Sequence, residues 1–185
     1  MRVEFRILGP LDALVDGRPV GLGGRHQRAL LALLVVQANE VVQADRLIDG
    51  IWDEAPPETA ANVLQGHVSQ LRKLLGRETI VTRGPGYVLA APDGALDLHR
   101  FEQLAATAAA EHDAGRAGSA ASQLAAALAL WRGPALSDIA DLPAVRPIAA
   151  RLDELRLAAD LLRRDVLDRA HELAVGGTAL GRRPA

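Results

Sequence analysis

The chain has 185 residues, of which 49% are hydrophobic but only 3% aromatic, so a core has to be built from aliphatic side chains and alanine. The absence of cysteine excludes disulfides, thiolate metal sites and cysteine nucleophiles. A net charge of −2 does not by itself indicate a nucleic-acid partner, but the charge is unevenly spread, because residues 40–58 sum to −5 and residues 62–87 to +3.

Two features of the sequence bear on location. No apolar run reaches the roughly 18 residues that a membrane span needs. The residues after Met1 alternate between polar and apolar types, unlike a secretory signal. We therefore expect a cytoplasmic protein without a membrane association.

Residues 1–22 predict a small antiparallel sheet. Val3, Phe5 and Ile7 alternate with charged residues, which is the period of a half-buried strand. Asp16-Gly17 is a strong hairpin signal, because both central residues of a type I′ turn need a positive φ.

Three helices are predicted next, over residues 25–37, 43–52 and 57–75. The first is apolar almost all round and should be the most buried. The third has one apolar stripe and ends before Gly76, a common helix stop. Its stripe consists of Ala61, Leu64, Val68, Leu71 and Leu75.

Two further strands and a helical region complete the predicted fold. Residues 79–83 and 87–89 flank the tight turn Gly84-Pro85-Gly86. After residue 91 the sequence becomes rich in alanine and helical in period. We expect a first domain with these strands and helices over residues 1–91, a helical domain over 96–173 and a disordered tail over 174–185.

The outward face of the third helix has the composition of a DNA-reading surface. Asn and Gln side chains can pair with adenine, and Ser can bond bases or phosphates. A glycine at its centre allows close backbone approach, and basic residues near its end, Arg77 among them, suit phosphates. An ordinary amphipathic helix with a solvated polar face has the same pattern. The candidate residues are Thr59, Asn62, Gly66, Ser69, Gln70, Arg72 and Lys73.

The hairpin after this helix favours DNA binding. It presents Arg83 at its tip, and an arginine there can enter a minor groove. Tyr87 can donate its hydroxyl to a phosphate, or can simply pack on the sheet. Gly84 and Gly86 do not form a phosphate-binding loop, because no helix follows them.

No catalytic pattern is found. The five histidines show no metal-ligand spacing, and no serine lies in a nucleophile elbow. We therefore expect neither an enzyme nor a metal or cofactor site.

The element order and several motifs resemble a known family. Residues 82–87, Thr-Arg-Gly-Pro-Gly-Tyr, are similar to the wing of OmpR/PhoB-type winged helices. Residues 64–72, 101–104 and 127–134 resemble the Streptomyces antibiotic regulatory proteins (SARPs), in which that domain precedes a bacterial transcriptional activation domain. The resemblance covers residues 3 to about 170.

The resemblance implies a mainly α fold with small β-sheets, in which a winged helix-turn-helix precedes an all-α, TPR-like domain. It places the third helix in the major groove of double-stranded DNA, Arg83 in the minor groove and Tyr87 on a phosphate. It assigns the acidic loop with Asp53 and Glu54 to RNA polymerase. It also implies binding to promoter direct repeats, activation of a biosynthetic gene cluster, a possible homodimer on DNA and a place at the nucleoid.

Two departures leave alternatives open. Many relatives have an arginine where this chain has Gln70, which weakens the expected phosphate affinity. The helical region is shorter than in the family, and TPR-like units need about three repeats for stability. The alternatives are a helical protein-interaction scaffold and a truncated regulator with weak DNA binding.

Overall fold

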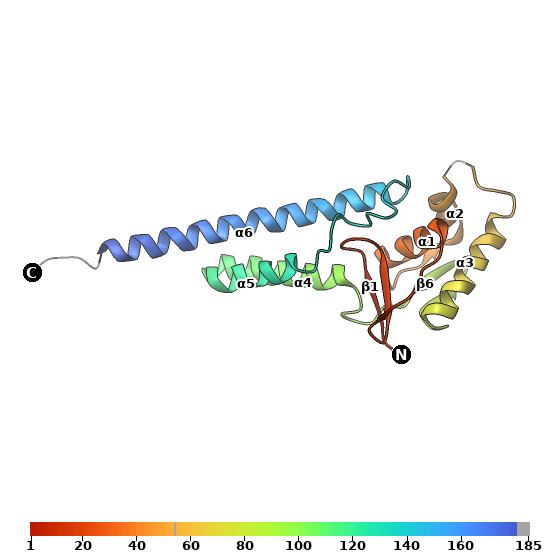
Figure 1. Ribbon diagram of the computed structural model, residues 1–185, viewed down its shortest axis with the longest axis horizontal. Helices are drawn as coiled ribbons and strands as arrows, with labels where there is room; N and C mark the ends of the chain where they lie inside the picture. The colour runs from red at the N-terminus through yellow and green to blue at the C-terminus, as the bar shows by residue number, and fades with distance from the viewer. Residues whose placement is uncertain (54, 181–185) are drawn as a thin grey trace, which may run out of the picture. The chain divides into compact units, whose positions relative to one another are not determined.

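A computed structural model gives the fold and describes residues 1–53 and 55–180, with side chains through His171. It confirms a mainly helical chain with two small antiparallel sheets. The elements are β1 (Val3–Arg6), β2 (Asp12–Val15), β3 (Arg18–Pro19), α1 (Arg25–Val36), β4 (Val42–Gln43), α2 (Ala44–Trp52), α3 (Ala60–Leu75), β5 (Ile80–Arg83), β6 (Gly86–Leu89), α4 (Asp97–Asp113), α5 (Ala117–Leu128) and α6 (Arg146–Leu180) (Figure 1).

The chain forms two compact units. The first contains residues 1–99 and 132–152, and the second contains residues 100–131 and the chain from Asp153 onward. The sequence-based prediction divides the chain near residue 91 and places residues 132–152 in the helical domain, whereas the structure places them in the first unit. Among the described residues, no helix is both long enough and apolar enough to cross a membrane.

The first sheet has the order β1-β2-β3, with Val3 opposite Val15. Its hairpin turns at Asp16 and Gly17, whose φ angles are 50° and 77°, as the sequence predicts for a type I′ turn. Phe5 on β1 is 1% exposed and belongs to the core.

The three helices of the first unit lie near their predicted positions. α1 is the most buried, with its residues 29–35 all in the core. α3 begins at Ala60 rather than at Pro57, because residues 57–60 form a turn in which the Ala60 N–H donates to the Pro57 carbonyl oxygen at 2.8 Å. The buried stripe of α3 therefore starts with Ala60, and Ala61 is exposed, contrary to the prediction.

The second sheet has the order β4-β6-β5 and carries the wing. The two-residue strand β4 is absent from the sequence-based prediction. It pairs Val42 with Tyr87 and Gln43 with Gly86. A Cβ on Gly86 would clash with the Val42 carbonyl group, so this glycine allows β4 to approach β6.

Residues 132–152 are joined to the first sheet by long-range hydrogen bonds. The Arg132 side chain donates to the Asp12 carboxylate at 2.7 Å and to the Pro10 carbonyl oxygen at 2.8 Å. The Asp138 carboxylate accepts from the Leu11 N–H at 2.7 Å and from the Arg28 Nε at 2.7 Å. These contacts make this segment a structural part of the first unit.

A buried carboxylate completes the first unit. Asp97, 8% exposed, accepts hydrogen bonds from the backbone N–H groups of Ile7 and Leu8 at 2.9–3.0 Å. Burial raises the pKa of Asp97 above its ordinary value, although these hydrogen bonds act against the rise.

The second unit is a bundle of α4, α5 and α6, with α6 alongside the other two (Figure 1). The rings of Phe101 and Trp131 meet edge to face at 5.5 Å, and the Arg156 guanidinium lies 5.4 Å from the Trp131 ring. The sequence predicts this last helix over residues 144–173, whereas α6 continues to Leu180. Residues 181–185 of the predicted tail lie outside the described residues.

Candidate nucleic-acid interface

One face of α3 is polar and open to solvent. The helix has 3.6 residues per turn, so burial of every third or fourth residue leaves the opposite face free. In Figure 1 α3 is on the outer side of α1 and α2. The exposed residues are six of the seven that the sequence predicts on this helix and its start: Thr59, Asn62, Gly66, Ser69, Gln70 and Lys73.

Gly66 lies near the middle of the exposed face. A Cβ added there would meet no atom of the protein within 4 Å. Packing therefore does not explain a glycine in a helix interior, where it costs about 1 kcal/mol relative to alanine. Close backbone approach by a ligand is a physical reason that is consistent with the open space.

A basic depression of about 400 Å³ lies at the carboxyl end of α3. It is lined by Ser69, Arg72, Lys73 and Arg77. Three cations and a hydroxyl around one depression suit a phosphate group, which needs charge and hydrogen-bond donors. The sequence predicts only a general phosphate role for Arg77, and the structure places it beside three of the candidate residues of α3.

Arg72 differs from the other candidates because it is half-buried. Its Nε donates to the Ile80 carbonyl oxygen at 2.7 Å, and its Nη2 donates to the Thr82 hydroxyl at 2.9 Å. The side chain therefore connects α3 to the first strand of the wing. Sequence reasoning missed this role, because helical spacing places Arg72 on a flank but does not show the strand beside it.

The wing exposes Arg83 at the end of β5, next to the turn residues Gly84 and Pro85. Gly84 has a φ of 54°, which suits this tight turn. Tyr87 is 8% exposed and lies in β6 opposite Thr82. Its ring is packed on the sheet, so a phosphate contact by Tyr87 is limited to its hydroxyl and stays a prediction.

The acidic loop begins at the end of α2. Asp53 is exposed and has a φ of 56°, and its N–H donates to the Asp49 carbonyl oxygen at 2.8 Å. Glu54, the second residue predicted to contact polymerase, lies outside the described residues. Asp53 therefore projects from a turn that closes α2, with its carboxylate open to a partner.

Three aromatic side chains form a cluster across α1, α2 and α3. His26 of α1 is 5.4 Å from the Trp52 ring of α2 and 6.5 Å from the His67 ring of α3. Burial, and secondarily the charge of His26, hold the pKa of His67 below its ordinary value. Sequence reasoning missed this cluster, since no spacing relates residues on three helices. The described residues include no group of three metal-ligating side chains.

Comparison with known protein families finds a match for each of the two parts of the chain. Residues 17–89 match the family described as "Transcriptional regulatory protein, C terminal", and residues 96–179 match the "Bacterial transcriptional activator domain". The same order of domains characterises the predicted family. The chain belongs to the SARP family of transcriptional regulators.

Several characterised proteins are similar to this SARP-type chain. The transcriptional regulatory protein EmbR of Mycobacterium tuberculosis is 43% identical over 85% of the chain and 42% of EmbR. The regulatory protein AfsR of Streptomyces coelicolor is 37% identical over 84% of the chain and 16% of AfsR. The transcriptional regulator RedD of the same organism is 33% identical over 85% of the chain and 47% of RedD.

A solved structure is similar along nearly the whole chain. It is EmbR of Mycobacterium tuberculosis in complex with a low affinity phosphopeptide, with a TM-score of 0.86 and 37% identity over 97% of this chain and 50% of that one. The SARP-type chain thus spans half or less of the length of each of these relatives. Both matched families are regulators rather than enzymes, which is consistent with the expected lack of catalysis.

Proposed function

We propose that this transcriptional regulator binds double-stranded promoter DNA with sequence specificity and activates transcription. The observation that carries the proposal is the continuity of three features on the first unit: the open polar face of α3, the basic depression at its end and the arginine-tipped wing. A solvated helix face alone does not account for the cations at its end and the arginine on the adjoining hairpin.

The roles divide by chemistry. Asn62 and Gln70 carry amides that can read base edges in the major groove, and Gly66 allows the helix to approach closely. The depression with Lys73 and Arg77 holds a phosphate and sets the position of the helix. Arg83 enters the minor groove, where the negative potential is strongest.

Activation follows from a second surface. The exposed Asp53 and its neighbour Glu54 form an acidic loop that contacts a basic surface of RNA polymerase. Family resemblance supports binding to direct repeats beside promoters of a biosynthetic gene cluster, with two copies on the DNA. Such a protein works at the nucleoid, in the cytoplasm.

The test is a gel-shift titration on promoter fragments over a series of salt concentrations. The logarithm of the binding constant should fall with the logarithm of salt, with a slope near −0.9 for each neutralised phosphate. Replacement of Lys73 or Arg77 by alanine should make that slope shallower by about 1. Glu58→Ala, an exposed change in the preceding turn, serves as the control and should leave the slope unchanged.

A helical interaction scaffold is the competing function. The net charge of −2 and the apolar groove of the second unit favour it. A scaffold predicts no shift of promoter fragments, or a shift that does not respond to salt. Either result would replace the DNA-binding proposal.

A further inference from the structure

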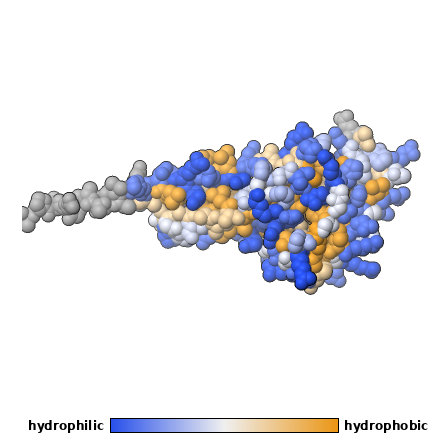
Figure 2. Space-filling view, in the orientation of Figure 1, coloured by the Kyte–Doolittle hydropathy of each residue, from blue (hydrophilic) through white to orange (hydrophobic). Residues whose placement is uncertain are grey.

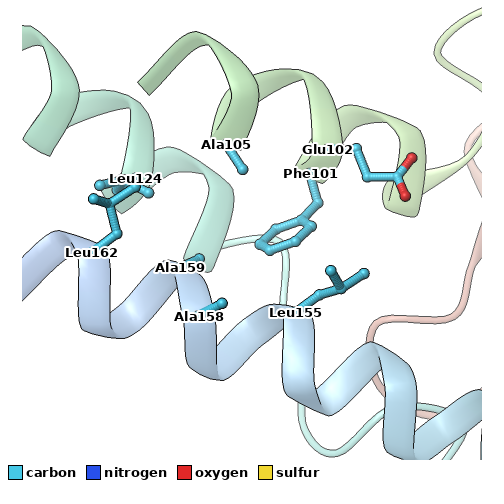
Figure 3. Close-up of a pocket in the computed structure, with 8 residues that line it drawn as sticks. All are labelled: Phe101, Glu102, Ala105, Leu124, Leu155, Ala158, Ala159 and Leu162. Atoms are coloured by element: carbon cyan, nitrogen blue, oxygen red, sulfur yellow. The ribbon is translucent and has the colours of Figure 1, made fainter. Parts of the chain in front are cut away.

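The second unit has an apolar groove between its three helices. The groove has a volume of about 290 Å³ and is lined by residues of α4, α5 and α6. Phe101 and Leu155 lie toward one end of it, and Leu124 and Leu162 lie toward the other (Figure 3). Apolar surface is visible over this bundle between charged side chains (Figure 2). Grooves between the helices of a bundle are frequent sites for small ligands.

Small side chains leave this groove open. α4 contributes Ala105, and α6 contributes Ala158 and Ala159. A methyl group is too short to fill the space between the larger side chains. Ala158 is exposed, and Leu155 and Leu162 are only half-buried, so the groove is accessible from solvent. Its apolar lining is therefore in contact with water, and a ligand with an apolar body would be stabilised by covering it.

Among the described residues that line the groove, only Glu102 of α4 is charged. It is exposed, and its carboxylate lies at the edge, outside the row of apolar side chains (Figure 3). Glu111 and Asp160 of the same unit have arginine partners at 2.6 Å. Within the residues that it describes, the structure places no such cation against Glu102. This carboxylate is therefore available to a ligand in the groove.

This combination suits one class of small molecule. An apolar body can pack between Phe101, Leu124 and Leu162, where it needs no hydrogen-bond partner. A cationic head group at the edge would be attracted by the Glu102 carboxylate and could donate charge-assisted hydrogen bonds to it. An anionic head group would be repelled by the same carboxylate, and a neutral hydroxyl would gain only an ordinary hydrogen bond. The groove should therefore distinguish ligands by the charge of the head group.

We propose that this groove binds a small amphipathic amine, with the apolar body between α4, α5 and α6 and the ammonium group at Glu102. A polar contact at an otherwise apolar site fixes the orientation of a ligand. The inference assigns the recognition of a small molecule to the helical unit of a chain that belongs to a family of transcriptional regulators. It goes beyond DNA binding and does not depend on it.

Probes that share an octyl chain and differ in the head group test the proposal. They are octylamine, octanol and octanoate, titrated into the full chain near neutral pH with calorimetric detection. Octylamine should bind saturably and about three- to fivefold more tightly than octanol, as expected for one exposed ion pair. Octanoate should bind more weakly than octanol, because Glu102 repels its charge. No saturable binding of octylamine, or equal affinity for all the probes, would overturn the proposal.

Glu102→Gln tests the contact with the head group. Glutamine keeps nearly the size of glutamate but removes the charge, so the preference for octylamine over octanol should disappear while the affinity for octanol is retained. Asp113→Asn removes a charge from another exposed position of α4 and is the matched control, which should keep the preference. A preference that survives Glu102→Gln would contradict the placement of the ammonium group at Glu102.

Ala158→Leu tests the apolar part of the groove. Position 158 is exposed, so the bundle can accept the larger side chain, which would occupy the space of the octyl chain. The affinities for octylamine and octanol should fall together by about tenfold, which corresponds to roughly two methylene groups that lose their cover. Ala106→Leu, at an exposed position of α4 that does not line the groove, is the control and should change neither affinity.

The same variant distinguishes other occupants. Unchanged affinity of the probes for Ala158→Leu would show that they bind elsewhere and would overturn the proposal. If no probe binds and Ala158→Leu alters the sedimentation of the chain, the groove accepts a second copy instead. None of these measurements includes DNA, so a failure of the gel shift would contradict the proposed function and leave this inference standing.

Discussion

The Nη2 of Arg72 on α3 donates a hydrogen bond to the Thr82 hydroxyl on β5 at 2.9 Å. With the second donation to the Ile80 carbonyl oxygen, the guanidinium holds the wing against α3. Arg72, which the sequence assigns to DNA contact, thus connects the two elements that we propose to contact DNA. Weakening this connection should affect affinity even where no DNA contact is removed.

Arg72→Lys tests that connection. Lysine keeps the charge but cannot make the two forked donations, so we expect a loss of about 1–3 kcal/mol in unfolding free energy and a drop in DNA affinity. Chemical denaturation and gel shifts measure the two effects. Arg77→Lys, an exposed substitution in the same depression, is the matched control and should leave stability unchanged. If both variants behave alike, Arg72 acts only as a charge.

Gly66→Ala should move stability and binding in opposite directions. Alanine in a helix interior is favoured over glycine by about 1 kcal/mol, and the added Cβ meets no protein atom, so the melting temperature should rise. DNA affinity should fall, because the Cβ stands between the helix backbone and the groove. Thermal unfolding and gel shifts check the pair of effects. Unchanged affinity would show that this face does not approach DNA closely.

Arg83→Ala should cost about 1–3 kcal/mol of DNA affinity and leave the fold intact, because its side chain is exposed at the end of β5. The measurements are binding titrations and thermal melts. Arg18→Ala, at an exposed strand position of the first sheet, controls for loss of a positive charge. A variant with unchanged affinity and unchanged melting temperature would remove the wing from the interface.

The acidic loop should separate transcription from DNA binding. Asp53→Ala combined with Glu54→Ala removes two negative charges from the proposed polymerase contact. We expect in vitro transcription to fall while the gel shift is retained. The control is Glu40→Ala with Asp45→Ala, which removes the same amount of charge from exposed positions earlier in the chain. A parallel fall in binding and transcription would mean that the loop is not an activation surface.

Asp97 gives the first unit a pH dependence of opposite sign to that of most carboxylates. Burial raises the pKa of the Asp97 carboxyl group in the folded state. Over the pH range between the unfolded and the folded pKa, the folded chain therefore keeps the carboxyl proton that the unfolded chain has lost. Its contribution to stability therefore falls as pH rises from the ordinary aspartate pKa through the raised folded value, and is constant above. Asp97→Asn removes this contribution.

The measurement for Asp97 is the difference in unfolding free energy between the wild-type chain and Asp97→Asn across the acid range. The difference should favour wild type most at the lowest pH and decline through that window. The difference is taken because other carboxylates affect the stability of the wild-type chain with the opposite sign. Arginines lower the pKa values of Glu111 and Asp141, so the contribution of these two groups to stability rises with pH. A difference that rises with pH would contradict the raised pKa.

The sequence predicts the local features well, because each depends on residues close together. Helical period identifies the exposed face of α3, and the Asp16-Gly17 pair identifies the turn between β2 and β3. Contacts between distant segments leave no such pattern. The partners of Asp97 are about 90 residues away, and the histidine–tryptophan cluster joins three helices. β4 has two residues, too few to show an alternation.

The return of residues 132–152 to the first unit affects how this regulator can be recombined with others. Asp138 and Arg132 satisfy backbone groups and charges of the first sheet. A chimera joined at residue 91 would carry α3 and the wing but would leave these groups to water. Exchange of DNA specificity between relatives should therefore succeed when the transplanted module includes both sections of chain. Its junctions then lie within α4, after α5 and within α6, rather than in the loop that precedes α4.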